Sequence, residues 1–444
     1  MRLLKNIFYV ILWPFRFWRL MLAGVVLLLV AHIIIDQMLL HKLAIQTQQI
    51  KEAGYPVTYA DLNLSEYTVI DNAHAVYEQV MDMIKKEPDT AAWSHYSLLI
   101  GRYVRANPCT PQKEEQPLSA EEKVELGNYL QQMQPAFDLL RKSRDCHVCI
   151  IPDFMTEINS INARGETVAI LVPGLAWMRE LTRYAAAKGL WEYQHDNQDA
   201  AFDWFAIGLN IANNHYCHPT LLGTLNRIGC INTVLTAVQL ALHEGDISGE
   251  IPASFITEFQ KCLDRNIYAQ TFQNERLYSN EMAQRMGLKS QSWRFTRPIL
   301  SLNELKINQL LCELTDVMMT TDFDQQETTL NAIRQWCEKS SRIYLVPKIL
   351  VPALLRSVES IRHVMASSGL CDTALKLKQF RQKNGAYPES LSELTQPLPA
   401  DPFSGHPFQY AREANGFTLT SAGKTFSYQG DTKMETNLTW STIR

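Results

Sequence analysis

Hydrophobic positions are unevenly distributed along the chain, and the longest apolar run lies near its beginning. From Leu20 to Ile35 no residue is charged, and the apolar character extends from Phe17 to about Leu40. This length reaches the roughly 20 residues that a helix needs to cross the hydrocarbon core of a bilayer. The pattern predicts a transmembrane helix, and residues 1–44 are assigned to a short stub and this span.

Aromatic and basic side chains precede the apolar run. Trp13, Trp18, Arg16 and Arg19 have the chemistry of residues found at the membrane–water interface. Pro14 predicts a break between the stub and the span. No small residues at the spacing of a signal-peptidase site follow the run, so an uncleaved anchor is expected.

Charge predicts the orientation of this anchor. The first 40 residues hold four basic side chains and one acidic one, whereas the rest of the chain is acidic. Because basic residues are retained on the cytoplasmic side, the N-terminus is expected in the cytoplasm and the body after residue 45 outside it. The four basic residues are Arg2, Lys5, Arg16 and Arg19.

Residues 45–345 are predicted to form an irregular α-helical body. Ser119 and Glu122 have the spacing of a capping box, which predicts a helix running toward Lys142. Residues 221–243 are apolar on most sides, so a buried helix is expected there. Alternating, strand-like patterns are almost absent before residue 400.

Residues 177–214 have the pattern of a helical hairpin. The first helix is predicted to end near Lys188 and Gly189, and the second to begin after an acidic turn. Small residues at 186, 200 and 201 resemble those of tetratricopeptide helix pairs, where two helices approach closely. No period of about 34 residues repeats along the chain, so a regular solenoid is not predicted.

A second, shorter apolar run occupies Ile343–Leu355. It contains two prolines and Lys348, and it is too short to cross a bilayer. A packed or interfacial turn is expected.

The last segment, residues 346–444, is predicted to contain a connecting helix followed by short strands. The helix should end at Asn384 and Gly385, a pair suited to a left-handed C-cap. A short helical turn is expected at 390–394. Strands are expected at 408–411, 416–421 and 426–428.

Residues 370–432 resemble the C-terminal module of the major pseudopilins of type II secretion. The residues that carry the resemblance, in order, are Asn384-Gly385, Tyr387-Pro388, Leu391, Leu394, Leu398-Pro399, Asp401-Pro402, Pro407, Tyr410, Gly416-Phe417, Ser421 and Gly423. The resemblance implies a small α+β module in a bacterial cell envelope. With the predicted anchor, it implies a single-pass protein of the inner membrane.

Composition narrows the possible functions. The 444 residues are 46% hydrophobic and carry a net charge of −4. The apolar content predicts an ordered globular chain. The acidic balance argues against a nucleic-acid-binding protein that depends on phosphate contacts.

The nine cysteines include one Cys-x-x-Cys pair, Cys146 and Cys149. Three interpretations stay open for it. The pair is a local disulfide or two idle thiols, a redox-active pair, or half of a zinc site completed by His215 and His218.

Other apparent catalytic motifs lack the required context. Ser421 and Lys424 have Ser-x-x-Lys spacing but follow a predicted strand, whereas that chemistry needs a helix. No cofactor and no catalysis are expected. The sequence predicts a mainly α, membrane-anchored scaffold that contacts protein partners. The alternatives are an accessory component of a type II secretion or pilus-like machine, and a zinc- or thiol-dependent envelope enzyme that uses Cys146 and Cys149.

Overall fold

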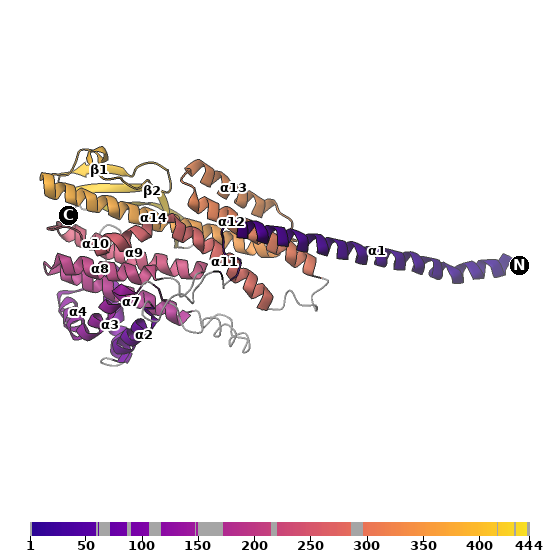
Figure 1. Ribbon diagram of the computed structural model, residues 1–444, viewed down its shortest axis with the longest axis horizontal. Coiled ribbons are helices and arrows are strands. Elements are labelled where there is room, and N and C mark those ends of the chain that lie inside the picture. Colours follow the sequence, from indigo (N-terminus) through magenta and orange to yellow (C-terminus); the bar gives the residue numbers. More distant parts are fainter. Residues whose placement is uncertain are drawn as a thin grey trace. The chain divides into compact units, whose positions relative to one another are not determined.

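The computed structural model describes residues 2–58, 61, 72–86, 90–105, 117–146, 148–149, 172–214, 220–285, 296–414, 416–429 and 432–441 (Figure 1). The first helices are α1 (Arg2–Glu52), α2 (His74–Lys86), α3 (Thr90–Arg105), α4 (Ala120–Gln132), α5 (Gln134–Arg141), the 3₁₀ turn η3 (Lys142–Asp145), α7 (Val172–Gln194) and α8 (Gln198–Asn213). They are followed by α9 (Leu221–Glu244), α10 (Ala253–Leu263), α11 (Arg265–Arg285), α12 (Arg297–Met319), α13 (Phe323–Lys339), α14 (Leu345–Asn384) and the 3₁₀ turn η6 (Leu391–Glu393). The strands are β1 (Gln409–Glu413), β2 (Gly416–Gln429) and β3 (Thr432–Ser441).

The chain divides into two compact units whose segments alternate along the sequence. The first unit contains Met1–Asn63, Gln273–Glu313 and Asn331–Pro352, and the second contains the remaining segments. The predicted division into residues 1–44, 45–345 and 346–444 stays a prediction.

In the first unit, α1 and α12 lie side by side and point in the same direction. The carboxylate of Asp36 accepts hydrogen bonds from Nε (2.8 Å) and Nη2 of Arg297. Further along both helices, the Gln46 side chain donates to the carbonyl oxygen of Leu305 (3.2 Å) and accepts from Asn308 (3.3 Å). Because the contacts advance together along the two helices, the helices are parallel.

α1 is long and apolar enough to cross a membrane. The stretch Trp18–Glu52 contains an apolar window none of which is buried. From Leu20 to Ile35 the side chains are exposed, apart from Ala31 and His32, which are half-buried. The predicted apolar N-terminal helix is thus present, and it continues into the packed part of the first unit.

By length and composition, α9 is also long and apolar enough to cross a membrane. In α9, the apolar stretch Leu221–His243 is 61% buried within the protein. It is the buried body helix that the sequence predicted.

The helices of the second unit pack around α7. This helix contacts α8 and α9, α10 packs against α8, and α2 and α3 also contact α7. Large aromatic side chains fill the space between them; Phe137 and Trp204, for example, meet edge to face with ring centroids 5.2 Å apart. Burial of these large rings contributes to the stability of the helical core.

The C-terminal strands form a three-stranded antiparallel sheet in the order β1-β2-β3. Gln409 pairs with Thr420 and Glu413 with Gly416, and the register between β2 and β3 shifts between Thr420 and Lys424. α14 ends at Asn384, and Gly385 has a φ of 79°. The predicted left-handed C-cap is confirmed, as is the short helical turn after Ser390.

Two predicted helix boundaries are wrong. α1 continues through Pro14, because a proline removes one hydrogen bond without ending an otherwise apolar helix. α7 continues through Gly189 to Gln194. A Cβ atom at Gly189 would lie 2.6 Å from Cε1 of Phe205, so this glycine allows two helices to approach and does not end one.

Two further predictions need correction. Residues 426–428 are the second half of β2, and the third strand is instead β3, whose polar sequence gave no strand signal. The apolar run Ile343–Leu355 is mostly the beginning of α14, with Pro352 inside the helix, and not a turn. The tetratricopeptide-like character of the body stays a prediction.

Candidate functional site

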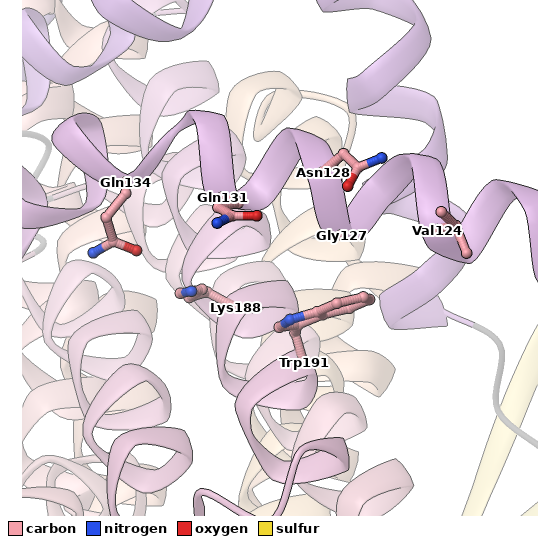
Figure 2. Close-up of a pocket in the computed structure, with 7 residues that line it drawn as sticks. All are labelled: Val124, Gly127, Asn128, Gln131, Gln134, Lys188 and Trp191. Atoms are coloured by element: carbon pink, nitrogen blue, oxygen red, sulfur yellow. The ribbon is translucent and has the colours of Figure 1, made fainter.

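A surface hollow lies between α4, α5 and α7 in the second unit (Figure 2). Its volume is about 340 Å³. Side-chain amides, a lysine, a valine and a tryptophan line it: Val124, Gly127, Asn128, Gln131, Gln134, Lys188 and Trp191. We call it the α4–α7 groove.

Gly127 and Trp191 give the α4–α7 groove its shape. A Cβ atom at Gly127 would lie 2.3 Å from Cη2 of the Trp191 indole. The same indole packs against the His195 ring, with centroids 4.4 Å apart. Any larger residue at 127 must therefore displace Trp191.

The only lysine of the groove is neutralised within its own helix. Nζ of Lys188 lies 2.8 Å from a carboxylate oxygen of Glu192. Burial raises the pKa of Glu192, but the hydrogen bond and charge of Lys188 outweigh this, and the pKa lies below its usual value. The groove therefore presents an ion pair and amides instead of a free charge.

Amide side chains can bind a ligand that offers both hydrogen-bond donors and acceptors. Asn and Gln each donate and accept hydrogen bonds, and Asn128 and Gln131 are both exposed. Val124 adds an apolar contact that is 64% exposed. A polypeptide backbone offers matching donors and acceptors, so the groove can hold a peptide segment.

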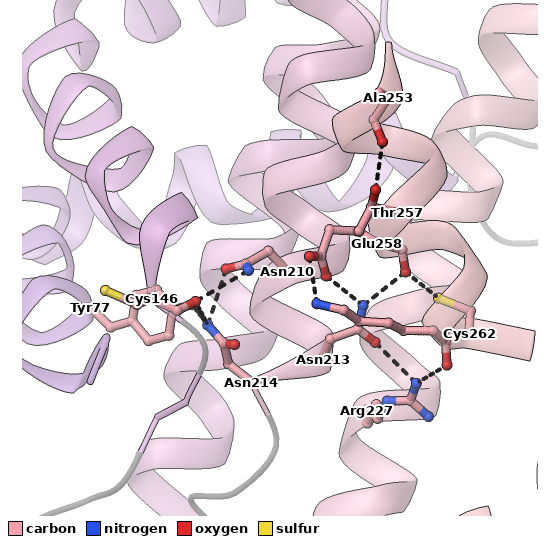
Figure 3. A network of polar contacts seen from close by, with 11 residues as sticks. Tyr77, Cys146, Asn210, Asn213, Asn214, Arg227, Ala253, Thr257, Glu258 and Cys262 are labelled. Carbon is pink, nitrogen blue, oxygen red and sulfur yellow. Dashed lines mark hydrogen bonds and ion pairs between the residues drawn. The ribbon is translucent and has the colours of Figure 1, made fainter. Parts of the chain in front are cut away.

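A second polar cluster is buried at the C-terminal end of α8 (Figure 3). The Asn214 amide donates to the Tyr77 hydroxyl (3.1 Å) and to the backbone carbonyl of Cys146 (3.4 Å). Asn210 also donates to that carbonyl (3.4 Å). Burial, with Cys149 nearby, raises the pKa of Tyr77 well above its usual value, so the hydroxyl stays neutral and structural.

The other half of this cluster surrounds a buried arginine. Arg227 is 1% exposed, and its Nη2 donates to Asn213 (3.0 Å) and to the backbone of Lys261 (2.8 Å). Its guanidinium lies 4.8 Å from the centre of the Tyr268 ring. Asn213 in turn donates to Glu258 (2.9 Å), which also pairs with Lys261 (2.7 Å). These bonds connect α8, α9 and α10.

The cysteines singled out from the sequence lie beside this cluster. Cys146 and Cys149 are both buried. Asn214, which contacts the Cys146 backbone, immediately precedes His215, but residues 215–219 lie outside the described residues. The disulfide and the zinc site stay predictions. Within the described ranges, no group of three or more potential metal ligands occurs.

Sequence reasoning missed the α4–α7 groove. Its residues come from segments about sixty positions apart, and neither segment contains a recognisable motif. A glycine inside a helix, such as Gly127, was the one available signal, since it indicates a close approach.

No protein-family model, curated protein or solved structure matches the chain. Its function is accordingly inferred from its own geometry.

Proposed function

We propose that this chain is a membrane-anchored helical scaffold that holds protein partners close to a bilayer. One observation carries the proposal. The exposed apolar part of α1 continues without interruption into a segment that Asp36 and Gln46 attach to α12. An apolar helix of this length is stable in a bilayer, and its attachment to a folded unit makes it an anchor for that unit.

In this proposal the anchor lies in a bacterial inner membrane, with the N-terminus in the cytoplasm and the body outside. The basic residues before the apolar run support this orientation. A chain without residues 1–35 should leave the membrane fraction, and a C-terminal periplasmic reporter should be active on the full chain. An active cytoplasmic reporter would contradict the orientation.

The α4–α7 groove is the proposed site of partner binding. Gln131 lies in the groove, whereas Gln260 is an exposed glutamine on α10 and serves as a matched control. A photo-crosslinking residue at 131, in cells, should give a defined adduct that Gly127→Leu abolishes. Equal adducts at both positions, or none at 131, would contradict binding in the groove.

A second candidate function is a zinc-dependent role, favoured by the contact between Asn214 and the Cys146 carbonyl. This contact brings the residue before His215 next to the first cysteine. Elemental analysis of the purified full chain tests it. One zinc per chain in the native protein would support this function over an inert cysteine pair. The zinc should be lost in the double variant Cys146→Ser/Cys149→Ser and equally in His215→Ala/His218→Ala.

The scaffold could serve as an accessory component of a secretion or pilus-like machine. Residues that carry the pseudopilin resemblance contact one another: Tyr387 packs edge to face on Phe417 (5.1 Å between centroids), and the Tyr410 hydroxyl donates to Pro388 (2.8 Å). Co-purification with secretion proteins, lost on deletion of residues 370–444, tests this role.

A further inference from the structure

An exposed apolar patch lies on the first unit, where α13 is followed by α14. Ile343, Leu345, Val346 and Ile349 are all exposed, with Leu345 at 62% and Ile349 at 66%. Ile299, in the first turn of α12, is exposed as well. We call these five residues the α13–α14 patch.

Asn303 joins the two parts of the patch. Its buried amide donates to the carbonyl oxygens of Ile299 (2.7 Å) and Ile343 (2.9 Å) and accepts from the backbone N–H of Val346 (3.2 Å). The beginning of α14 is therefore fixed against the first turns of α12. The apolar side chains belong to one rigid part of the molecule.

The ion pair between Asp36 and Arg297 places this patch along the axis of α1. Ile299 and Asn303 follow Arg297 by two and six residues, about 3 and 9 Å along the helix. Because α12 is parallel to α1, the patch lies about 3–9 Å beyond Asp36.

This depth matches the headgroup region of a bilayer. From Trp18 to Asp36 the helix rises about 27 Å, close to the roughly 30 Å of a hydrocarbon core. The headgroup region adds about 5–8 Å on each side. When Trp18 to Asp36 span the hydrocarbon core, the lipid headgroups therefore lie at the same level as the patch.

The side chains around the patch have interfacial chemistry. Trp336 and Tyr344 meet edge to face with ring centroids 5.4 Å apart, and Nζ of Lys306 lies 4.5 Å from the centre of the Trp336 ring. Lys339 and Arg342 are exposed. Aromatic rings mixed with basic side chains are typical of the membrane–water interface, and basic side chains attract anionic lipids.

We propose that the α13–α14 patch binds the surface of the same bilayer that α1 spans, with its apolar side chains among the headgroups and Lys339 and Arg342 on lipid phosphates. The inference rests on the proposed anchor. It adds a second membrane contact, which limits how far the first unit can tilt against the bilayer.

The test places a photo-crosslinking residue at one position at a time in the full chain. The protein is reconstituted in phosphatidylcholine vesicles with and without phosphatidylglycerol. Ile33 reports on the span, and Leu345 and Ile349 report on the patch. Gln309 is the control, because it is exposed on α12 but lies twelve residues, about 18 Å, beyond Arg297.

We expect lipid adducts at 33, 345 and 349 and none at 309. Lys339→Glu/Arg342→Glu should lower labelling at 349 in vesicles with phosphatidylglycerol, by up to about fivefold per charge, and leave labelling at 33 unchanged. Lipid adducts at 33 but none at 345 and 349 would overturn the second contact and leave the anchor intact. Loss at 33 would overturn the anchor as well, and protein–protein adducts at 345 or 349 would assign the patch to a protein partner.

Discussion

Asp36 and Arg297 stand 261 residues apart in sequence and form an ion pair in which two guanidinium nitrogens donate to one carboxylate. The Asp36 side chain is 6% exposed. A carboxylate that follows an apolar run is costly to bury unless a partner satisfies it. The pair therefore explains how an acidic residue is accommodated directly after the longest apolar run of the chain.

Removing only the arginine should destabilise the first unit. Arg297→Leu leaves a buried carboxylate without its cation, which costs about 3–5 kcal/mol in the free energy of unfolding. Thermal denaturation of the detergent-solubilised full chain measures this loss. Arg334→Leu removes an arginine whose guanidinium donates to Asn331 in the same helix (2.8 Å), and it should change little.

The double variant Asp36→Leu/Arg297→Leu separates loss of the pair from loss of packing. Two apolar residues of similar size leave no unpaired charge, so most of the lost stability should return. A double variant as unstable as Arg297→Leu would falsify the view that an uncompensated charge causes the defect.

The C-cap of α14 gives a second prediction. Gly385→Ala forces a Cβ atom into a left-handed backbone and should destabilise the C-terminal module by about 1–2 kcal/mol. Gly249 has an ordinary φ, and neither glycine has an atom within 4 Å of a new Cβ. Gly249→Ala is therefore the matched control and should be neutral, as measured by hydrogen exchange in β1 and β2. Equal protection in the two variants would contradict the cap.

Asp401 gives a third prediction. Its buried carboxylate accepts hydrogen bonds from the Ser421 hydroxyl (2.9 Å) and from the backbone of Ala422 (2.6 Å) and Phe403 (3.0 Å). Asp401→Ala leaves these donors unsatisfied and should cost about 2–4 kcal/mol. Limited proteolysis of the C-terminal module measures the effect, with Glu413→Ala on the exposed strand β1 as the control. Similar cleavage rates in the two variants would refute the role of Asp401.

His363 predicts a pH dependence. Burial lowers its pKa below the usual value, although Glu359 opposes this, and the ring packs on Phe403 with centroids 4.8 Å apart. As pH falls through about 6.5, the unfolded chain binds a proton that the folded chain does not, so stability is lost below that pH. His363→Gln should reduce the fall in melting temperature between pH 7 and pH 5. His195→Gln, at an exposed site, should leave that fall unchanged. An unchanged slope in His363→Gln would contradict this assignment.

Local signals in the sequence predicted local structure well. The capping box of Ser119 and Glu122 is present at the start of α4, with both reciprocal hydrogen bonds. The left-handed conformation of Gly385 and the buried helix α9 were also predictable, because each depends on residues close together in the chain. The apolar run of α1 belongs to the same class of signal.

Features that depend on distant residues were not predictable. Gly189 indicated a helix end, but its role depends on Phe205 in the next helix. The α4–α7 groove exists because Trp191 covers Gly127, and no pattern within either segment indicates that pairing. The partner of Asp36 could not be found either, because any of the 42 basic residues satisfies the same electrostatic requirement.

The alternating segments of the first unit set the order in which the protein can form during synthesis. The ribosome makes α1 first, yet its partners Arg297 and Asn308 follow only after the whole of α2 to α11. The helices α2 to α10 come from one uninterrupted stretch of the second unit, so they can pack before Arg297 has been made to pair with Asp36. The first unit thus contains the first residues to be translated, yet it cannot complete its native contacts until Pro352 has been made.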